Sequence, residues 1–139
     1  MDWGSGEYDA AEFVRQFEAG EYPGEKFHHG DHIRLAWIYV DSLGAAAAEE
    51  QIRTSILKFA THLNHPEKYH DTITRAWMRL VVFAHAIGPQ RGDFAAFIDR
   101  HRWLLERNTL ETFYSKPHLM SDAARNGWVE PDRRPLPGI

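Results

Sequence analysis

The sequence predicts an all-α protein, a compact single-domain bundle of about five to six helices with an extended C-terminal tail. Apolar residues recur at intervals of three and four through most of the chain, which is the period of an amphipathic helix. No apolar-polar alternation is long enough to indicate a strand. With 139 residues, 43% of them hydrophobic, the chain can bury one core without disulfides. We expect one domain over residues 1–139, with a flexible N-terminus at residues 1–8.

The first helix is predicted over residues 8–19. Phe13 and Phe17 lie four positions apart and therefore share one face of it. Gly20 can end this helix because glycine tolerates the left-handed conformation that often follows a helix. Residues 21–30 contain a proline and two glycines, so we expect a loop there.

A second helix is predicted over residues 31–43, with Asp31 as its cap and Gly44 as its end. The alanine run that follows has a high helix propensity and leads into apolar residues at helical spacing. It predicts a third helix over residues 45–63. Residues 64–71 include a proline and form a connection.

The fourth helix is expected to open at Thr72, which would cap it, and to end before Gly88 and Pro89. Its wide apolar stripe indicates a central position in the core. The periodic signal weakens after this helix. Shorter helical segments are predicted over residues 93–101, 103–107, 109–114 and 122–126, followed by an extended proline-rich tail over residues 129–139.

The overall charge and composition exclude several classes of function. The formal net charge is −4 with neutral histidines, and no basic stripe is visible, so we expect no nucleic-acid partner. The chain contains no cysteine, which excludes disulfides, thiolate metal sites and thiol catalysis and fits a cytoplasmic protein. No apolar run approaches the ~18 to 20 residues of a membrane span, so we expect no membrane partner.

Nine histidines make up the most informative chemical feature of the chain, and several of them are clustered. His29 and His32 lie three positions apart at the start of the second helix, so both rings can point the same way. His70 precedes the fourth helix, at the entry to the same predicted core. Imidazoles that facing helices deliver to a core are the usual ligands of metal sites in helical bundles.

These positions predict a mononuclear metal site held by His29, His32 and His70, with Glu18 as a carboxylate ligand and Asp31 as its alternative. Three protein ligands leave a coordination position open for water, dioxygen or substrate. Histidines with a carboxylate suit Fe, Mn or Zn, and histidines alone suit Cu equally well. The spacing leaves open whether the neighbouring His28 replaces His29.

The candidate site includes further residues around the metal. Trp37 and Trp77 are candidates for an aromatic pocket, and Thr74, one turn after His70, is a candidate to orient that ring. The same residues also have structural interpretations, since tryptophan at this spacing packs in cores and threonine bonds to backbone carbonyls. The candidate catalytic residues are His70, Tyr69 and Glu18.

Three separated motifs resemble a family of small bacterial all-helical proteins of uncharacterised function. The motifs are Phe27-x-His29-x-x-His32-Ile33-x-x-Ala36-Trp37, Lys68-Tyr69-His70-x-Thr72-x-Thr74-x-x-Trp77, and a tail with Val129-x-Pro131-Asp132-x-x-Pro135-Leu136-Pro137. The resemblance extends over about residues 9 to 137. It implies that His29, His32 and His70 belong to one functional set, since those are the histidines that lie inside the motifs.

The first functional hypothesis is therefore a small metal-dependent enzyme, an oxidoreductase or a hydrolase, acting on a small-molecule substrate. A non-catalytic helical module that binds a small ligand or a partner is the alternative, with the histidines satisfied by hydrogen bonds. Metal-free acid-base catalysis by His70 or His29 is a third reading. The tryptophan-rich helices also suggest a homo-oligomer.

Overall fold

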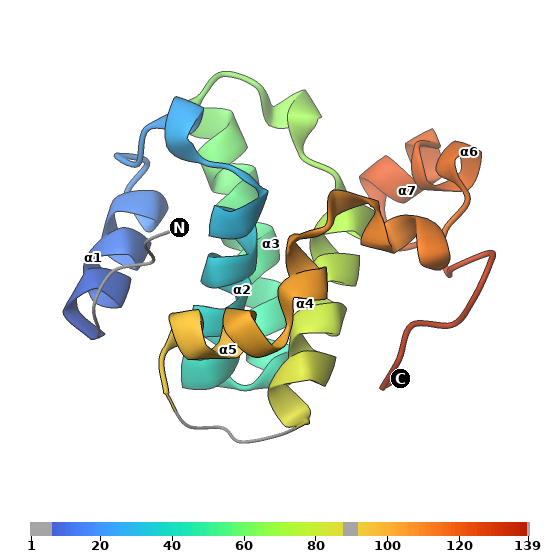
Figure 1. Cartoon of the computed structure of the whole chain (residues 1–139). Helices are drawn as coiled ribbons and strands as arrows, with labels where there is room; N and C mark the ends of the chain where they lie inside the picture. Colours follow the sequence, from blue (N-terminus) through green and yellow to red (C-terminus); the bar gives the residue numbers. More distant parts are fainter. Residues whose placement is uncertain (1–6, 88–91, 139) are drawn as a thin grey trace.

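The computed structural model describes residues 7–87 and 92–138, which form an all-helical protein, so the predicted fold class is confirmed (Figure 1). The predicted flexible N-terminus falls largely on residues 1–6, and the predicted stop at Gly88 and Pro89 falls on residues 88–91, both outside the described residues. The α-helices of the described chain are α1 (Glu7–Glu18), α2 (His29–Leu43), α3 (Ala45–His62), α4 (Asp71–Ala86), α5 (Phe94–Arg100), α6 (Lys116–Leu119) and α7 (Asp122–Asn126).

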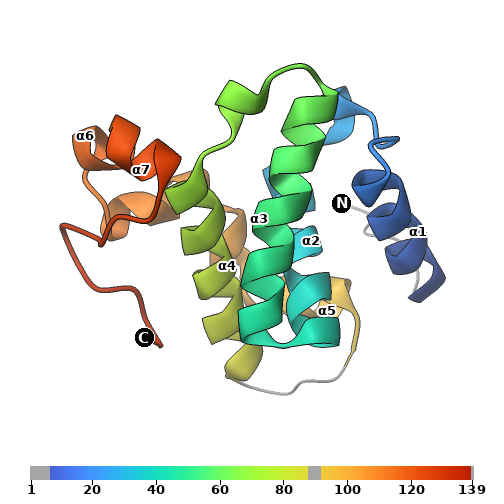
Figure 2. The ribbon, with the colours of Figure 1, turned by 180° about the vertical axis from the view of Figure 1, so that it is seen from behind.

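The helices α2, α3 and α4 form the centre of the fold and pack against one another. Helix α1 lies against α3 on one side of this group, and α7 lies against α4 on the other, as both views show (Figures 1 and 2). Helix α5 packs across α2. The three central helices therefore hold the start of α2 and the start of α4 in one fixed framework.

The core contains the apolar faces that the helical spacing predicts. Ile33, Ala36 and Val40 of α2 are buried, and Trp77 and Leu80 are buried on α4. The buried apolar side chains form one cluster that includes residues of every α-helix from α1 to α6 and of the tail. This continuity is what a single folding unit requires.

The turn between α2 and α3 is a single residue, Gly44. Its φ of 83° and ψ of 168° lie in a region that is open almost only to glycine. Its N–H donates to the carbonyl of Val40, which closes the last turn of α2. This residue therefore allows two long helices to pack side by side with no further connecting residue.

Two helices begin at residues other than those predicted, because histidines cap them. Helix α2 begins at His29 with His28 as its cap, and the Asp31 carboxylate accepts a hydrogen bond from the His28 N–H 3.0 Å away. Helix α4 begins at Asp71 with His70 as its cap. Thr72, predicted as that cap, instead lies inside the helix and is fully buried.

The chain after α5 is less regular than predicted. The segments expected to be helical over residues 103–107 and 109–114 form 3-10 helices, Arg102–Leu105 (η3) and Arg107–Thr112 (η4). The short α6 was not predicted, and α7 lies at the predicted position. Short segments of this kind depend on tertiary contacts more than on their own propensity, since an isolated turn is unstable.

The C-terminal tail is extended, as predicted, and it is fixed to the rest of the protein. The hydroxyl of Thr72 donates to the Gly127 carbonyl at 2.7 Å and accepts from the Val129 N–H at 3.1 Å. The Tyr114 hydroxyl donates to the Val129 carbonyl at 2.8 Å, and Leu136 is 4% exposed. The tail is therefore part of the packed structure.

Within the described ranges, no helix combines the length and the apolar character that crossing a bilayer requires.

Candidate functional site

A cavity of about 700 Å³ opens between the start of α2, the first half of α4 and the segment over residues 107–120. We call it the histidine cavity. Its volume lies in the range of sites for small molecules. It is lined by Phe27, His28, His29, His32, Ile73, Trp77, Arg107, Asn108, Leu110, Glu111, Lys116, Leu119 and Met120.

His29 is held at the cavity wall by η3. Its Nε2 lies 2.8 Å from the carbonyl oxygen of Leu104, and a carbonyl only accepts, so Nε2 carries the proton and Nδ1 keeps its lone pair. Its ring centre is 4.4 Å from that of Trp77. Burial lowers the pKa of His29, the Leu104 carbonyl raises it in part, and the positive charge of Arg107 lowers it further. The ring is therefore neutral at pH 7.

His32 lies one turn further along α2, and its Nε2 is buried without a hydrogen-bond partner among the described residues. Burial lowers the pKa of His32 to about 3, and the nearby His29 contributes to the shift. The ring stacks near Phe27, with centres 6.4 Å apart. A buried polar atom without a partner costs about 1–3 kcal/mol, so this nitrogen requires an explanation.

His70 has no ring nitrogen left for a metal ion. Its Nδ1 accepts from the Ile73 N–H at 3.1 Å, and its Nε2 donates to the Leu119 carbonyl at 2.8 Å. Burial lowers its pKa, which the Leu119 carbonyl partly offsets. The ring therefore caps α4 and joins it to α6, although it lies directly behind Leu119, a residue of the cavity wall.

Glu18 and Trp37 line a different hollow, a groove of about 660 Å³ between α1, α2 and α5. The Glu18 carboxylate accepts from the Tyr39 hydroxyl at 2.5 Å, and Trp37 packs against Phe94 and Phe97. Neither side chain lines the histidine cavity. The structure thus brings His29, His32 and Trp77 together, and it places Glu18 and Trp37 elsewhere.

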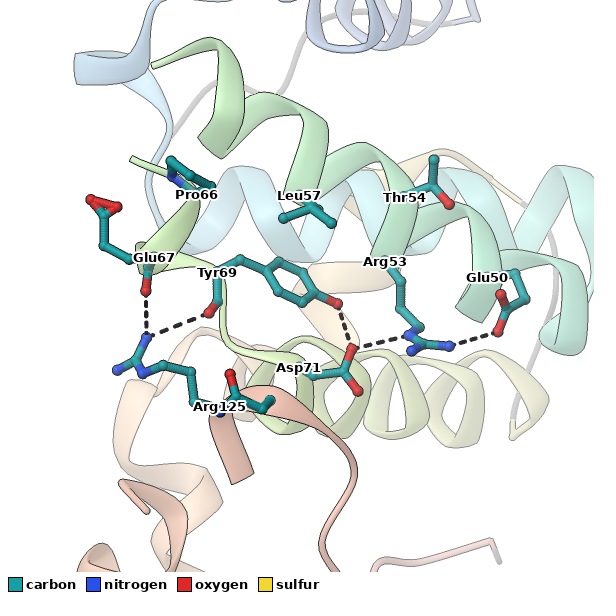
Figure 3. A pocket seen from close by; sticks show the side chains of 10 residues that line it. Glu50, Arg53, Thr54, Leu57, Pro66, Glu67, Tyr69, Asp71 and Arg125 are labelled. Atoms are coloured by element: carbon teal, nitrogen blue, oxygen red, sulfur yellow. Dashed lines mark hydrogen bonds and ion pairs between the residues drawn. The ribbon is translucent and has the colours of Figure 1, made fainter. Parts of the chain in front are cut away.

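Tyr69 lies in a third hollow of about 590 Å³, where its hydroxyl donates to the Asp71 carboxylate at 2.7 Å (Figure 3). Arg53 donates to the same carboxylate oxygen at 3.0 Å, and Arg125 reaches the Glu67 and Tyr69 carbonyls. Burial raises the pKa of Tyr69, and its hydrogen bond to Asp71 raises it further. Tyr69 is thus a protonated structural donor.

Thr74 is buried in α4 and is not among the residues that line the histidine cavity. Over residues 7–87 and 92–138, no three His, Asp or Glu side chains are grouped as a metal site requires. The predicted ligand set is therefore not assembled in this arrangement, since His70 is engaged by backbone groups and Glu18 lines another hollow.

The opposite wall of the cavity could not be anticipated from local pattern. Arg107, Asn108 and Glu111 come from η4, and Lys116 and Met120 from α6 and the residue after it. The helical period is weak in these segments, and charged residues there have the ordinary interpretation of a solvated surface. Only the folding of the segment back over α2 and α4 makes them part of a site.

In comparisons with protein-family models, curated proteins and solved structures, none matches this chain. The resemblance to a bacterial family therefore stays a prediction.

Proposed function

We propose that this protein binds a small organic molecule in the histidine cavity, through a hydrogen bond at His32 Nε2 and contact with the ring of Trp77. The unpartnered buried nitrogen of His32 is the observation that carries the proposal. A polar ligand atom bonded to that nitrogen would remove the cost of burying it alone, so binding energy is available there. Because the nitrogen is buried, the His32 ring has to turn toward the cavity to make this contact. This corresponds to the non-catalytic binding module among the hypotheses above.

The electrostatics of the site support a neutral, hydrogen-bonding role for the histidines. Since burial holds the pKa of both His29 and His32 below the ordinary value, neither ring carries a charge at pH 7. A neutral imidazole can donate or accept, according to its tautomer. The Phe27 ring and the small exposed part of the Trp77 indole, which is 3% exposed, supply apolar surface against which a planar molecule can lie.

The test is a binding titration with neutral planar heterocycles: indole, benzimidazole and quinoline. We expect saturable binding that shifts the imidazole nitrogen resonances of His32 in long-range ¹H–¹⁵N spectra. His32→Phe should weaken binding about tenfold, the worth of one hydrogen bond of about 1.4 kcal/mol. His65→Phe is the matched control, because His65 is exposed and does not line the cavity.

Equal affinity of wild type and His32→Phe for these compounds would contradict the proposal. So would spectra in which none of the three compounds moves the His32 resonances at millimolar concentration.

The metal-dependent enzyme is the second candidate, because His29 Nδ1 and His32 Nε2 both lack a described partner and belong to rings of the same cavity. The ring centres are 6.5 Å apart. Two imidazoles on one tetrahedral ion have centres about 5 Å apart, given metal–nitrogen bonds of about 2.1 Å. Binding of Fe, Mn, Zn or Cu would thus require the rings to approach each other.

Calorimetric titration of metal-stripped protein with each of these ions tests the second candidate. Near-stoichiometric binding that is lost in both His29→Ala and His32→Ala, and kept in His65→Ala, would favour it over the metal-free site. Metal binding that His65→Ala removes and His29→Ala keeps would exclude this cavity as the site.

A further inference from the structure

All but three of the arginines that the structure describes have an interaction partner. Arg107, Arg133 and Arg134 have no side-chain hydrogen bond, ion pair or ring contact among residues 7–87 and 92–138. The other described arginines each have an interaction partner. An unpaired arginine keeps five donors in a planar fork, which suits a carboxylate or a phosphate.

These three arginines line two neighbouring hollows. Arg107 lines the histidine cavity, and Arg133 and Arg134 line a neighbouring hollow of about 700 Å³. Asn108 and Glu111 line both, so the two spaces share a wall. Arg107 therefore lies on the wall of the histidine cavity, and the other two unpaired arginines lie in the hollow next to it.

The charge balance of the histidine cavity is positive, although the formal net charge of the chain is −4. Arg107 and Lys116 are the cations of its lining, and Glu111 is the acid. Lys116 also lacks a side-chain partner among the described residues, and the lining histidines with resolved shifts, His29 and His32, are neutral at pH 7. A cavity with a surplus of unpaired cations attracts anions more strongly than the surrounding acidic surface does.

We propose that the ligand of the histidine cavity is a planar organic anion. Its flat part lies along the cavity lining formed by Phe27 and Trp77, with a polar atom at His32, and its carboxylate or phosphate is bound by Arg107 and Lys116. This inference rests on the proposed function and adds the ligand's charge to it. Arg133 and Arg134 lie beyond Glu111 and raise the local concentration of the anion.

Glu111 limits the charge that the site accepts. Glu111 lines both spaces, so an anionic group that reaches from one space into the other would come near its negative charge. Like charges in contact are unfavourable. A single anionic group at the Arg107 side is therefore preferred over a polyanion that reaches across both spaces.

The test uses four probes with one ring system and different end groups: naphthalene-2-carboxylate, 2-naphthyl phosphate, naphthalene-2-carboxamide and 2-naphthylmethylamine. Affinities are measured by calorimetry at low salt, and His32 resonances are followed in parallel. We expect the carboxylate or the phosphate to bind at least about tenfold more tightly than the carboxamide, and the amine to bind most weakly. The better of the two anions distinguishes a carboxylate ligand from a phosphorylated one.

The variants assign the effect to the cations of the cavity. Arg107→Gln combined with Lys116→Gln should reduce the affinity for the anions to that for the carboxamide and leave the affinity for the carboxamide unchanged. Arg133→Gln with Arg134→Gln should lower the association rate of the anions and leave their dissociation rate unchanged. Arg102→Gln is the matched control, an exposed arginine that pairs with Asp99 outside the cavity.

Equal binding of the carboxylate and the carboxamide would overturn the anion inference, while leaving the proposed small-molecule site intact. The same holds if Arg102→Gln weakens anion binding as much as the double variant does. If none of the four probes moves the His32 resonances, the inference fails together with this ligand class.

Discussion

His32 is the residue at which local stability and the proposed function conflict. Its buried Nε2 has no partner among the described residues, so the folded protein loses the hydrogen bond that water supplies when the chain is unfolded. An apolar side chain of similar shape would avoid this loss. Local violations of this kind are concentrated at functional sites, which is consistent with a ligand-binding role.

His32→Phe should therefore raise the free energy of unfolding by about 1–2 kcal/mol at pH 7, measured by urea denaturation. His65→Phe changes an exposed ring and should stay within about 0.5 kcal/mol of wild type. His32→Leu, with a smaller side chain, serves as a second variant in case the phenyl ring does not fit. Loss of stability in both His32 variants would show that the nitrogen is satisfied in the folded protein.

The buried histidines also determine how stability responds to acid. Burial lowers the pKa of His29, His32 and His70 in the folded protein, and for His32 it lowers the pKa to about 3. The unfolded chain therefore binds more protons below its ordinary histidine pKa of about 6.5. The contribution of these neutral histidines to the free energy of unfolding should therefore be present above about pH 6.5 and be lost as the pH falls towards 3.

For His32 alone the expected loss between pH 7 and pH 5 is about 2 kcal/mol. Urea denaturation at both pH values gives the loss of unfolding free energy for wild type and for His32→Phe. The difference between these two losses is the contribution of His32. An equal loss in the two proteins would mean that His32 is not the residue that titrates.

Single residues of the site could be predicted only in part. The i, i+3 spacing correctly placed His29 and His32 on one helical turn, and both line the cavity with Trp77. The same spacing could not show that backbone groups occupy both nitrogens of His70. The partner of Nδ1 lies three residues away in the helix that His70 caps, but the partner of Nε2 lies 49 residues away in the chain, so spacing alone cannot identify a ligand.

At the level of elements, α3 and α4 are joined by a ladder of buried and half-buried charges. Asp71 accepts from Arg53 and Arg75, and Glu49 accepts from Arg75 and Arg79. Arg75 and Arg79 also lie over the Trp128 ring, 5.2 and 4.0 Å from its centre. The ladder therefore connects two helices and the beginning of the tail.

Asp71→Asn should lower the free energy of unfolding by about 2–4 kcal/mol at pH 7, because it leaves two arginines without their shared acid. Burial alone raises the pKa of Asp71, but the hydrogen bonds from Tyr69 and the arginines outweigh it and lower the pKa. The stabilisation by the ionised Asp71 carboxylate is therefore present above about pH 4 and is lost as the pH falls below it. The variant should therefore lose less stability than wild type below pH 4.

Asp99→Asn is the control for this experiment, since Asp99 forms an ion pair in which both side chains are more than 70% exposed. A change of more than about 1 kcal/mol in the control, or of less than that in Asp71→Asn, would contradict the prediction.

The turn at Gly44 gives a second prediction at this scale. Gly44→Ala should cost about 1–3 kcal/mol by thermal denaturation. An added Cβ meets no atom within 4 Å, so the whole penalty comes from the φ of 83°. Gly127→Ala is the control, because that glycine has an extended φ of −172° and room for a Cβ. Equal stability of the two variants would show that the turn is not strained.

The positions of the long helices could be predicted, but the beginnings of two of them could not. The apolar residues of α2 and α4 mark the face that packs on the core, and they recur along the whole length of each helix. Their spacing therefore predicts the helix. A helix start depends on which neighbouring polar group accepts the free N–H groups. At α4 both His70 and Thr72 could cap the helix. His70 does so, and the Thr72 hydroxyl instead forms hydrogen bonds with the backbone of the tail.

At the level of the whole molecule, the tail acts as part of the core. Leu136→Ala should lower the free energy of unfolding by about 2–4 kcal/mol, because Leu136 is 4% exposed. Leu43→Ala, the same change at a side chain that is 48% exposed, should cost less than about 1 kcal/mol. Urea denaturation compares the two. Similar costs at both positions would mean that the tail is not packed in solution.

The overall class followed from the sequence, whereas the path of the last forty residues did not. The proline-rich composition of the tail predicts that it is extended, which it is. Composition does not say what an extended segment lies against. The histidine cavity closes only when residues 107–120 cross the starts of α2 and α4, so its second wall is a property of the tertiary structure.

The hydrogen bonds of Thr72 cannot form on the ribosome until the tail has been synthesised. Its hydroxyl donates to a carbonyl 55 residues later in the chain. At about 5–20 residues per second, a ribosome needs roughly 3 to 11 seconds to synthesise the intervening segment. During that interval the emerging α4 presents polar groups and apolar surface that have not yet been covered. Nascent chains stalled after Thr72 and before Gly127 should therefore bind chaperones more strongly, and be cut by proteases faster, than full-length chains.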